Sequence, residues 1–260
     1  MMNIHPFASL IVIATCAASL AQTIASEEVD PVDLAQPKTS AFFASIDIAS
    51  AYIEDDGEVS NDSLVIQPGF GIEWDVLDTF SMELSVWANY ATKRDDGMTQ
   101  SHGFTQIDTA LGITREFDSG FEIGFAFGTW QYPNRDDKNG EEALVLELAQ
   151  RLGLVTVGTE VEYVLTGDDN NNKVECIPFV EIEQRVTEDV TASVRCHLDY
   201  TWPEGGEPSS WTAYGLTARI EAFDVYAYAS YWGQMSDSIY TDEMHDKKST
   251  VFGIGYAIEL

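Results

Sequence analysis

The residues with the clearest chemical potential in this sequence are carboxylates that recur at every second position. Glu160 and Glu162 are two apart, and so are Glu181 and Glu183. Residues two apart on an extended strand point to the same face, so each pair would present two negative charges to one surface. Arg195 lies on the next segment and could face this acidic wall. A surface lined with carboxylates favours cations and disfavours anions.

Side chains that could support catalysis are present but badly spaced. Ser193 and His197 would lie about 13 Å apart along an extended strand, which is too far for a hydrogen bond. His102 and His245 fall in predicted loops. The sequence contains neither a Gly-x-Ser-x-Gly nor a His-Glu-x-x-His motif. We therefore expect no enzymatic activity and no cofactor.

One tract of oxygen-bearing side chains, Asp168-Asp169-Asn170-Asn171-Asn172, could bind a hard cation. It lacks the glycine and the terminal glutamate of an EF-hand loop. Such tracts are commonly solvated turns, so we predict no dedicated metal site. The alternative is loose binding of Ca²⁺ or Mg²⁺ by acidic loops, with the ions bridging to lipopolysaccharide phosphates.

The composition excludes several classes of protein. The chain has 260 residues and a formal net charge of −31, from 13 Lys and Arg against 44 Asp and Glu. Such a chain repels phosphate backbones and anionic headgroups, which argues against nucleic-acid binding and a polybasic membrane anchor. Hydrophobic residues make up 45% of the chain, which argues against intrinsic disorder.

The first residues resemble an export signal. Met1–Ser26 contains no Asp, Glu, Lys or Arg, and Phe7–Leu20 is almost continuously apolar or small. This pattern is typical of a secretory signal peptide and is too short for a spanning helix. We predict a signal peptide at 1–25, a flexible acidic segment at 26–40 and a β-barrel at 41–260. Lipid attachment at Cys16 is the alternative to ordinary cleavage.

Beyond residue 40 the sequence alternates apolar with polar or small residues, which is the β period. Twelve segments show it. They are 42–52, 64–72, 80–90, 106–114, 121–128, 144–149, 157–165, 180–183, 190–200, 214–221, 225–232 and 252–260. Short turns, including one predicted at Trp74–Thr79, alternate with long acidic loops. That asymmetry is typical of bacterial outer-membrane barrels.

The polar face favours a membrane barrel over a soluble β-sandwich, although both show this alternation. It is rich in glycine, which suits a narrow lumen better than a soluble surface. Aromatic residues recur near strand ends on the apolar face, as in interfacial girdles. These are Phe42, Tyr52, Phe80, Tyr90, Phe117, Phe121, Tyr163 and Tyr200. The predicted fold is all-β, an antiparallel up-and-down transmembrane β-barrel of about twelve strands, located in the bacterial outer membrane.

The alternation also predicts which charged residues line the lumen. They are Asp47, Glu83, Asp108, Glu122, Glu160, Glu162, Glu181, Glu183, Arg195, His197, Asp199, Arg219 and Glu221. Glu147 and Arg151 belong to the same face. Because acids dominate, we predict a porin-like pore for small cationic or neutral solutes. The alternatives are a plugged barrel whose carboxylates are structural, and a non-conducting barrel that acts through its acidic loops.

Three segments resemble the first strands of the TorF-like porins. They are Ser45–Tyr52 (SIDIASAY), Val65–Gly69 (VIQPG) and Val86–Tyr90 (VWANY). The resemblance covers about Ser45–Tyr90, and the rest of the chain shares only the strand rhythm. It implies an outer-membrane β-barrel in contact with lipid and lipopolysaccharide. The residues after Tyr52 differ from the aromatic-Arg-Gly expected there.

Two cysteines, Cys176 and Cys196, follow the predicted signal peptide. Exported proteins can form disulfides. The predicted strand alignment places these two about four residues out of register, too far apart for a bond. We therefore expect two free thiols on one face.

Overall fold

The computed structural model describes residues 40–53, 59–77, 79–93, 98, 100–134, 140–167, 173–202, 210–234 and 248–259. The predicted signal peptide and nearly all of the predicted acidic segment at 26–40 lie outside these residues. The acidic loop runs also lie outside them: Glu54-Asp55-Asp56, Asp95-Asp96, Asp136-Asp137, Asp168-Asp169 and Asp242-Glu243. Predictions about those segments therefore stay predictions.

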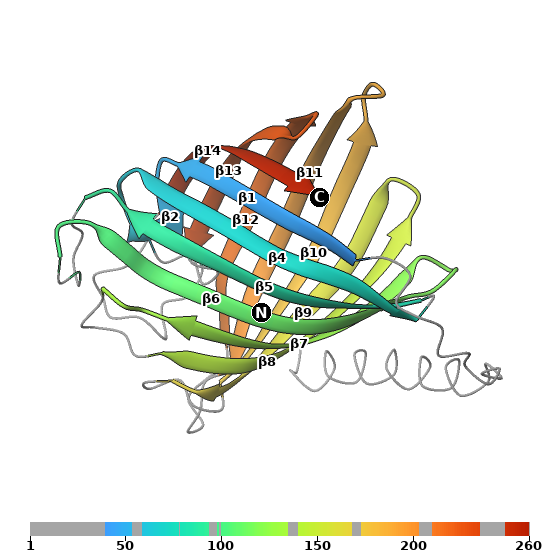
Figure 1. Ribbon diagram of the computed structural model, residues 1–260, viewed down its shortest axis with the longest axis horizontal. Coiled ribbons are helices and arrows are strands. Elements are labelled where there is room, and N and C mark those ends of the chain that lie inside the picture. Colours follow the sequence, from blue (N-terminus) through green and yellow to red (C-terminus); the bar gives the residue numbers. More distant parts are fainter. Residues whose placement is uncertain are drawn as a thin grey trace, which may run out of the picture. The chain divides into compact units, whose positions relative to one another are not determined.

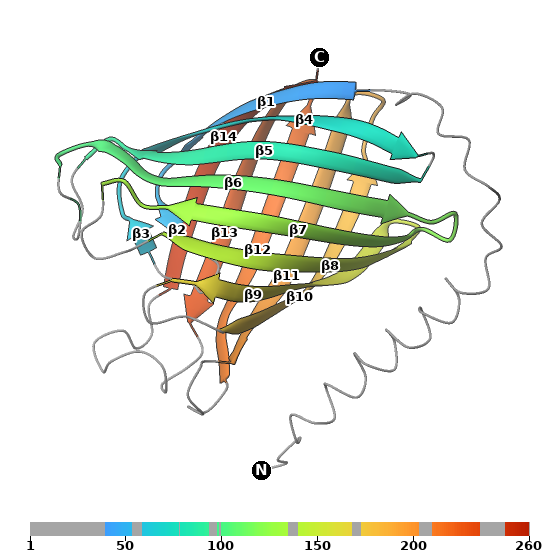
Figure 2. The same ribbon diagram turned by 60° about the horizontal axis from the view of Figure 1, so that its bottom comes forward.

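Twelve strands close into one antiparallel barrel, as the alternation predicted (Figures 1 and 2). The strands are β1 (Ser40–Ala49), β4 (Val65–Leu77), β5 (Phe80–Ala91), β6 (Gly103–Glu116), β7 (Phe121–Gln131), β8 (Glu141–Leu152), β9 (Val155–Thr166), β10 (Val174–Arg185), β11 (Val190–Trp202), β12 (Ser210–Ala222), β13 (Val225–Gln234) and β14 (Lys248–Glu259). Each strand pairs with its neighbours in sequence, and β1 pairs with β14 to close the barrel.

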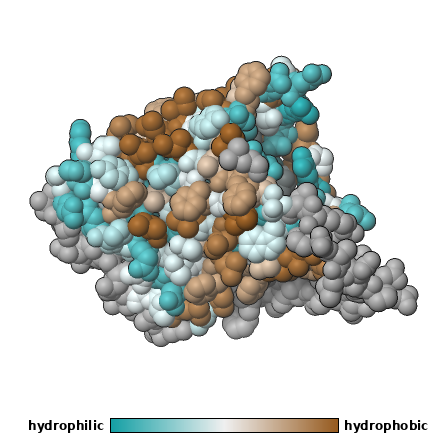
Figure 3. All heavy atoms as spheres, in the orientation of Figure 1, coloured by the Kyte–Doolittle hydropathy of each residue, from teal (hydrophilic) through white to brown (hydrophobic). Residues whose placement is uncertain are grey.

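The outward face of the barrel carries the large apolar side chains. Phe42, Phe125 and Phe252 are 57%, 51% and 62% exposed. Figure 3 shows apolar residues spread over the barrel wall, with hydrophilic residues gathered mainly toward its ends. A soluble protein buries such side chains, whereas a barrel in lipid presents them to the acyl chains.

The connections alternate in length around the barrel, as predicted. Tight turns join β6 to β7 and β8 to β9, where Gly120 and Gly153 have φ values of 74° and 68°. Glycine suits these positions because a β-carbon strains a left-handed backbone. The strand ends that the longer connections join lie at the opposite end of the barrel. The described part of the chain contains no helix with the length and hydropathy needed to cross a bilayer.

The first predicted strand is too long at its end. β1 stops at Ala49, and the chain then forms a small hairpin from β2 (Tyr52–Ile53) and β3 (Val59–Asn61). Tyr52 contacts Trp87, with ring centroids 5.5 Å apart, and donates a hydrogen bond to Gln106 Oε1 at 3.1 Å. Both partners belong to the inward residue set of the wall. Tyr52 therefore packs inside the barrel, and its predicted place in the aromatic girdle on the outer face is wrong.

The second predicted strand is too short. β4 continues to Leu77, through most of the predicted turn at Trp74–Thr79. Its pairing with β5 places Glu73 opposite Glu83, and Asp75 opposite Ser81. The alternation of inward residues therefore continues beyond residue 72, where the predicted strand ended. It adds two carboxylates, Glu73 and Asp75, to the inward face.

The two cysteines are free, as expected. Cys176 lies opposite Tyr200, and Cys196 lies opposite Val180. The two cysteines are therefore four residues out of register in the sheet, as the sequence predicted. The same register places both thiols on the outward residue set.

Candidate functional site in the barrel interior

The pairing register places all thirteen predicted charged or histidine residues on the inward residue set, the positions that alternate with the exposed apolar side chains. The clearest marker is Tyr226 on β13, whose hydroxyl donates to Asp47 Oδ2 on β1 at 2.7 Å. The two strands are separated by β14, so this bond crosses the inner surface above Gly255. Whether these residues line an open path stays a prediction.

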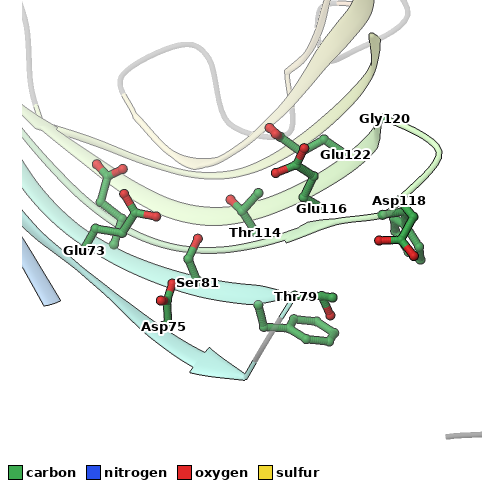
Figure 4. A pocket seen from close by; sticks show the side chains of 12 residues that line it. Glu73, Asp75, Thr79, Ser81, Thr114, Glu116, Asp118, Gly120 and Glu122 are labelled. Carbon is green, nitrogen blue, oxygen red and sulfur yellow. The ribbon is translucent and has the colours of Figure 1, made fainter. Parts of the chain in front are cut away.

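An acidic cavity of about 660 Å³ lies against β4, β5, β6 and β7 at the turn end of the barrel. Its lining includes six carboxylates: Glu73, Asp75, Glu83, Glu116, Asp118 and Glu122. In Figure 4, Glu73, Asp75, Glu116 and Glu122 extend from their strands toward the concave side of the sheet. Among the lining residues, all of which the structure describes, none is Lys, Arg or His. We call this the acidic cavity.

A second cavity, of about 410 Å³, lies against β9 to β13 and contains both signs of charge. Its charged lining residues are Glu160, Glu181, Arg195 and Arg219, and His197 lies beside them. We call this the mixed-charge cavity. Of these two cavities, only the mixed-charge cavity is lined by basic residues.

The four-carboxylate wall predicted at β9 and β10 is only partly assembled. Glu160 and Glu181 both line the mixed-charge cavity. Glu162 lies further toward the loop end, opposite Glu175. Glu183 lies toward the turn end, 3.7 Å from Arg151, and both side chains are more than half exposed. Arg195 lies directly opposite Glu181, on the neighbouring strand that the sequence indicated.

A polar network spans the seam where the barrel closes. Arg219 donates to Glu221 Oε2 at 2.6 Å, and its guanidinium lies 3.7 Å from the centroid of the Tyr226 ring. Tyr226 in turn donates to Asp47. This chain of contacts links β12, β13 and β1, so three of the predicted lumen residues help to fasten the seam.

A buried amide network holds the β2–β3 hairpin against the inner wall. Asn89 Nδ2 donates to Asn61 Oδ1 and to Thr105 Oγ1, both at 2.7 Å. Asn89 Oδ1 accepts from Gln67 Nε2 at 3.0 Å. All four residues are buried. The sequence interpretation gave these amides no role, because their partner Asn61 lies on an unpredicted hairpin.

An apolar cluster lies at the loop end of the barrel, beside that network. Ala49, Ile53, Val65 and Val251 are buried together there. Tyr228, Trp232 and Tyr52 are among the residues that pack against this cluster. The β2–β3 hairpin and the apolar cluster together occupy part of the barrel interior at the loop end.

Four residues of the acidic cavity were missed by sequence reasoning: Glu73, Asp75, Glu116 and Asp118. A signal for the first two existed, because the inward series Gly69, Gly71, Glu73, Asp75 keeps the period of two. Asp118 lies in a turn, where periodicity carries no information. Among the described residues, no group of three or more His, Cys, Asp or Glu is arranged to hold a metal ion.

Comparisons with known proteins give the fold. No family model and no curated protein matches the chain. An outer-membrane channel from Pseudomonas putida F1 is 12% identical, with a TM-score of 0.51, covering 90% of this chain and all of that one. A protein solved in a study of in-meso crystallization of membrane proteins is 9% identical, with a TM-score of 0.51, covering 85% and 84%. The NanC porin is 9% identical, with a TM-score of 0.49, covering 83% and 98%. The closed antiparallel barrel and the match to the Pseudomonas putida channel show that the chain is an all-β protein with the fold of an outer-membrane β-barrel.

Proposed function

We propose that the protein is a porin-like barrel of the bacterial outer membrane that passes small cationic or neutral solutes. The proposed role is transport without catalysis. Its support is the closed barrel, the apolar outer face and the fold shared with an outer-membrane channel. Its partners would be phospholipid and lipopolysaccharide, with Ca²⁺ or Mg²⁺ at the acidic loops.

The acidic cavity is the observation that carries the cation preference. Six carboxylates line one side of the interior with no basic residue among them. A cation about 8 Å from one carboxylate in water gains about 0.5 kcal/mol, and an anion loses as much. Several such charges on one wall favour cations along that side of the interior.

Neutralising this wall should reduce the selectivity. In the triple variant Glu83→Gln, Glu116→Gln, Glu122→Gln, we expect the cation-to-anion permeability ratio to fall at least about fivefold at 10 mM salt, because one carboxylate about 8 Å from the ion already changes it by about that factor. The effect should be small at 1 M salt, where the screening length is about 3 Å. Reversal potentials of the refolded protein in planar bilayers, under a salt gradient, measure the ratio.

The matched control keeps the charges and shortens the side chains. The variant Glu83→Asp, Glu116→Asp, Glu122→Asp should retain the wild-type ratio, because the number of carboxylates is unchanged. An unchanged reversal potential in the glutamine variant would show that the acidic cavity does not border the ion path.

The membrane location can be tested on the outer face. Phe125 lies outward near the middle of β7. Placing arginine there should cost about 2–3 kcal/mol of folding free energy in phospholipid vesicles, because a charge near the bilayer midplane is poorly solvated. Urea titrations followed by tryptophan fluorescence give this value.

The control for that experiment is Phe125→Leu, which keeps the position apolar and should cost less than about 1 kcal/mol. A water-soluble barrel predicts small costs for both variants, since an exposed phenylalanine can become arginine or leucine at little cost. Extraction from cells without detergent, as a monomer, would contradict the membrane location directly.

A non-conducting structural barrel is the second candidate. The β2–β3 hairpin and the apolar cluster at the loop end favour it, because they narrow the interior. The same planar-bilayer recordings decide between the two functions. A correctly folded protein that inserts and gives no conductance steps at any salt concentration would be such a barrel.

A further inference from the structure

The mixed-charge cavity holds charges that a simple cation path does not require. Glu160 and Glu181 contribute carboxylates, while Arg195 and Arg219 contribute guanidinium groups. Its volume of about 410 Å³ lies in the range of pockets that hold small organic molecules. A solute that itself carries both signs of charge could contact acidic and basic groups here at once.

Arg195 presents an open guanidinium to this cavity. Its guanidinium carbon lies 4.1 Å from the centroid of the Phe179 ring. Stacking covers one face of the group and leaves its N–H donors at the edge available for a carboxylate. Within the described ranges, Arg195 makes no side-chain hydrogen bond and no ion pair. Arg219 differs, because Glu221 already accepts a hydrogen bond from it.

Glu181 lies directly across from Arg195 in the β10–β11 pairing, yet no ion pair joins these two described residues. Residues opposite each other in a sheet have β-carbons about 5 Å apart. Arg195 turns instead toward Phe179, which belongs to the next inward position of β10. A positive and a negative group therefore stand beside each other with a gap between them. An ammonium and a carboxylate on one carbon atom could bridge such a gap.

The apolar lining residues of the cavity are Ile177 and Trp232, and His197 lies beside them. Phe179 lies under the Arg195 guanidinium and outside this lining, and the Phe179 and His197 rings are both closely packed. Phe179 lies against Gly158, and His197 lies against Gly215, and a β-carbon at either glycine would overlap the ring. The His197 and Trp232 rings meet edge to face, with centroids 4.6 Å apart. Ile177 and Trp232 can contact an apolar side chain while the charged groups beside them bind the polar end of a solute.

We propose that the mixed-charge cavity binds a small zwitterion with an apolar side chain, of the α-amino acid type. Its carboxylate pairs with Arg195, its ammonium with Glu181, and its side chain packs against Trp232. This inference rests on the proposed transport function, since it names the solute class. Binding itself can be measured without conduction.

The test uses three probes with one carbon skeleton: leucine, 4-methylpentanoate, which lacks the ammonium, and 3-methylbutylamine, which lacks the carboxylate. Saturation-transfer NMR on the refolded full chain in detergent micelles measures their affinities. Leucine should bind about tenfold more tightly than either analogue, because only it makes both charge-assisted contacts. Equal affinity of leucine and 4-methylpentanoate would overturn the zwitterion site, and so would lack of saturation by all three.

Variants assign the two contacts. Arg195→Gln should reduce the leucine affinity to that of the amine, and Glu181→Gln to that of the acid. Arg151→Gln, which removes a positive charge from an exposed side chain outside the cavity, should leave the affinity unchanged. If Arg195→Gln fails to fold, as heat-modifiable gel mobility would show, Arg195→Lys keeps the charge but loses the bidentate geometry. Undiminished leucine binding in that variant would contradict the assignment.

Liposome swelling separates this inference from the proposed function. Vesicles that admit no solute, together with leucine binding in micelles, would contradict the channel and leave the site standing. Vesicles that conduct cations, together with no leucine binding, would contradict the site and leave the channel standing.

Discussion

Replacing Asn89 with leucine should lower the free energy of unfolding by about 3–6 kcal/mol. The Asn89 amide donates to Asn61 and Thr105 and accepts from Gln67, and its side chain is fully buried. Leucine has a similar volume but no polar atoms. Three buried groups would each lose this partner, at a cost of up to about 1–3 kcal/mol apiece. The total stays below the full sum because Thr105 still donates a hydrogen bond to Asn61.

Urea unfolding in phospholipid bilayers measures that change. The control is Ser85→Ala, on the same strand and the same inner face, which should change the stability by less than about 0.5 kcal/mol. Because Asn61 belongs to β3, the Asn89 variant should also release the hairpin and raise the single-channel conductance. A loss of less than 1 kcal/mol, roughly the value of a single neutral hydrogen bond, would mean that the network does not hold the hairpin.

Adding one methyl group at Gly255 should have an effect of similar size. A β-carbon there would overlap both the Tyr226 ring and the Asp47 carboxylate. Gly255→Ala must therefore displace Tyr226 and break its hydrogen bond to Asp47 across β14. Overpacking costs about 1–3 kcal/mol, and a hydrogen bond to a charged group contributes about 1.5–3 kcal/mol. We expect a total loss of about 3–5 kcal/mol.

Gly112→Ala is the matched control for this substitution. A β-carbon at Gly112 would lie 3.6 Å from its nearest neighbours, which is ordinary van der Waals contact. Gly112 is also an inward glycine in a strand, so its replacement by alanine should be nearly neutral or stabilising. Tyr226→Phe separates the two contributions, since it removes the hydroxyl and keeps the ring. Equal stabilities of the Gly255 and Gly112 variants would contradict the packing at the seam.

The face on which each strand residue lies could be predicted from the sequence. A strand alternates its side chains with a period of two, so one apolar residue fixes the orientation of its neighbours. This is why all thirteen predicted charged or histidine residues fall on the inward set. The same reasoning failed at Tyr52, because the chain leaves the wall after Ala49 while the alternation continues by chance.

Which inward residues meet could not be predicted, because periodicity does not fix the register between strands. Glu162 and Glu181 are both inward, yet Glu162 lies opposite Glu175 while Glu181 lies opposite Thr156. A hydrogen-bond pattern across three strands and a hairpin, such as the one around Asn89, depends on every one of those registers.

The sequence by itself determined the class of fold and the sign of the charge on the inner wall. Both follow from local alternation and from the excess of carboxylates. Only the tertiary structure decided how that charge is distributed. The registers of neighbouring strands group the carboxylates of β4 to β7 in an acidic cavity and the charges of β9 to β12 in a mixed-charge cavity. The physical reason is that a cavity is made by neighbouring strands, and the alignment of neighbours depends on turns and inward contacts far apart in the chain.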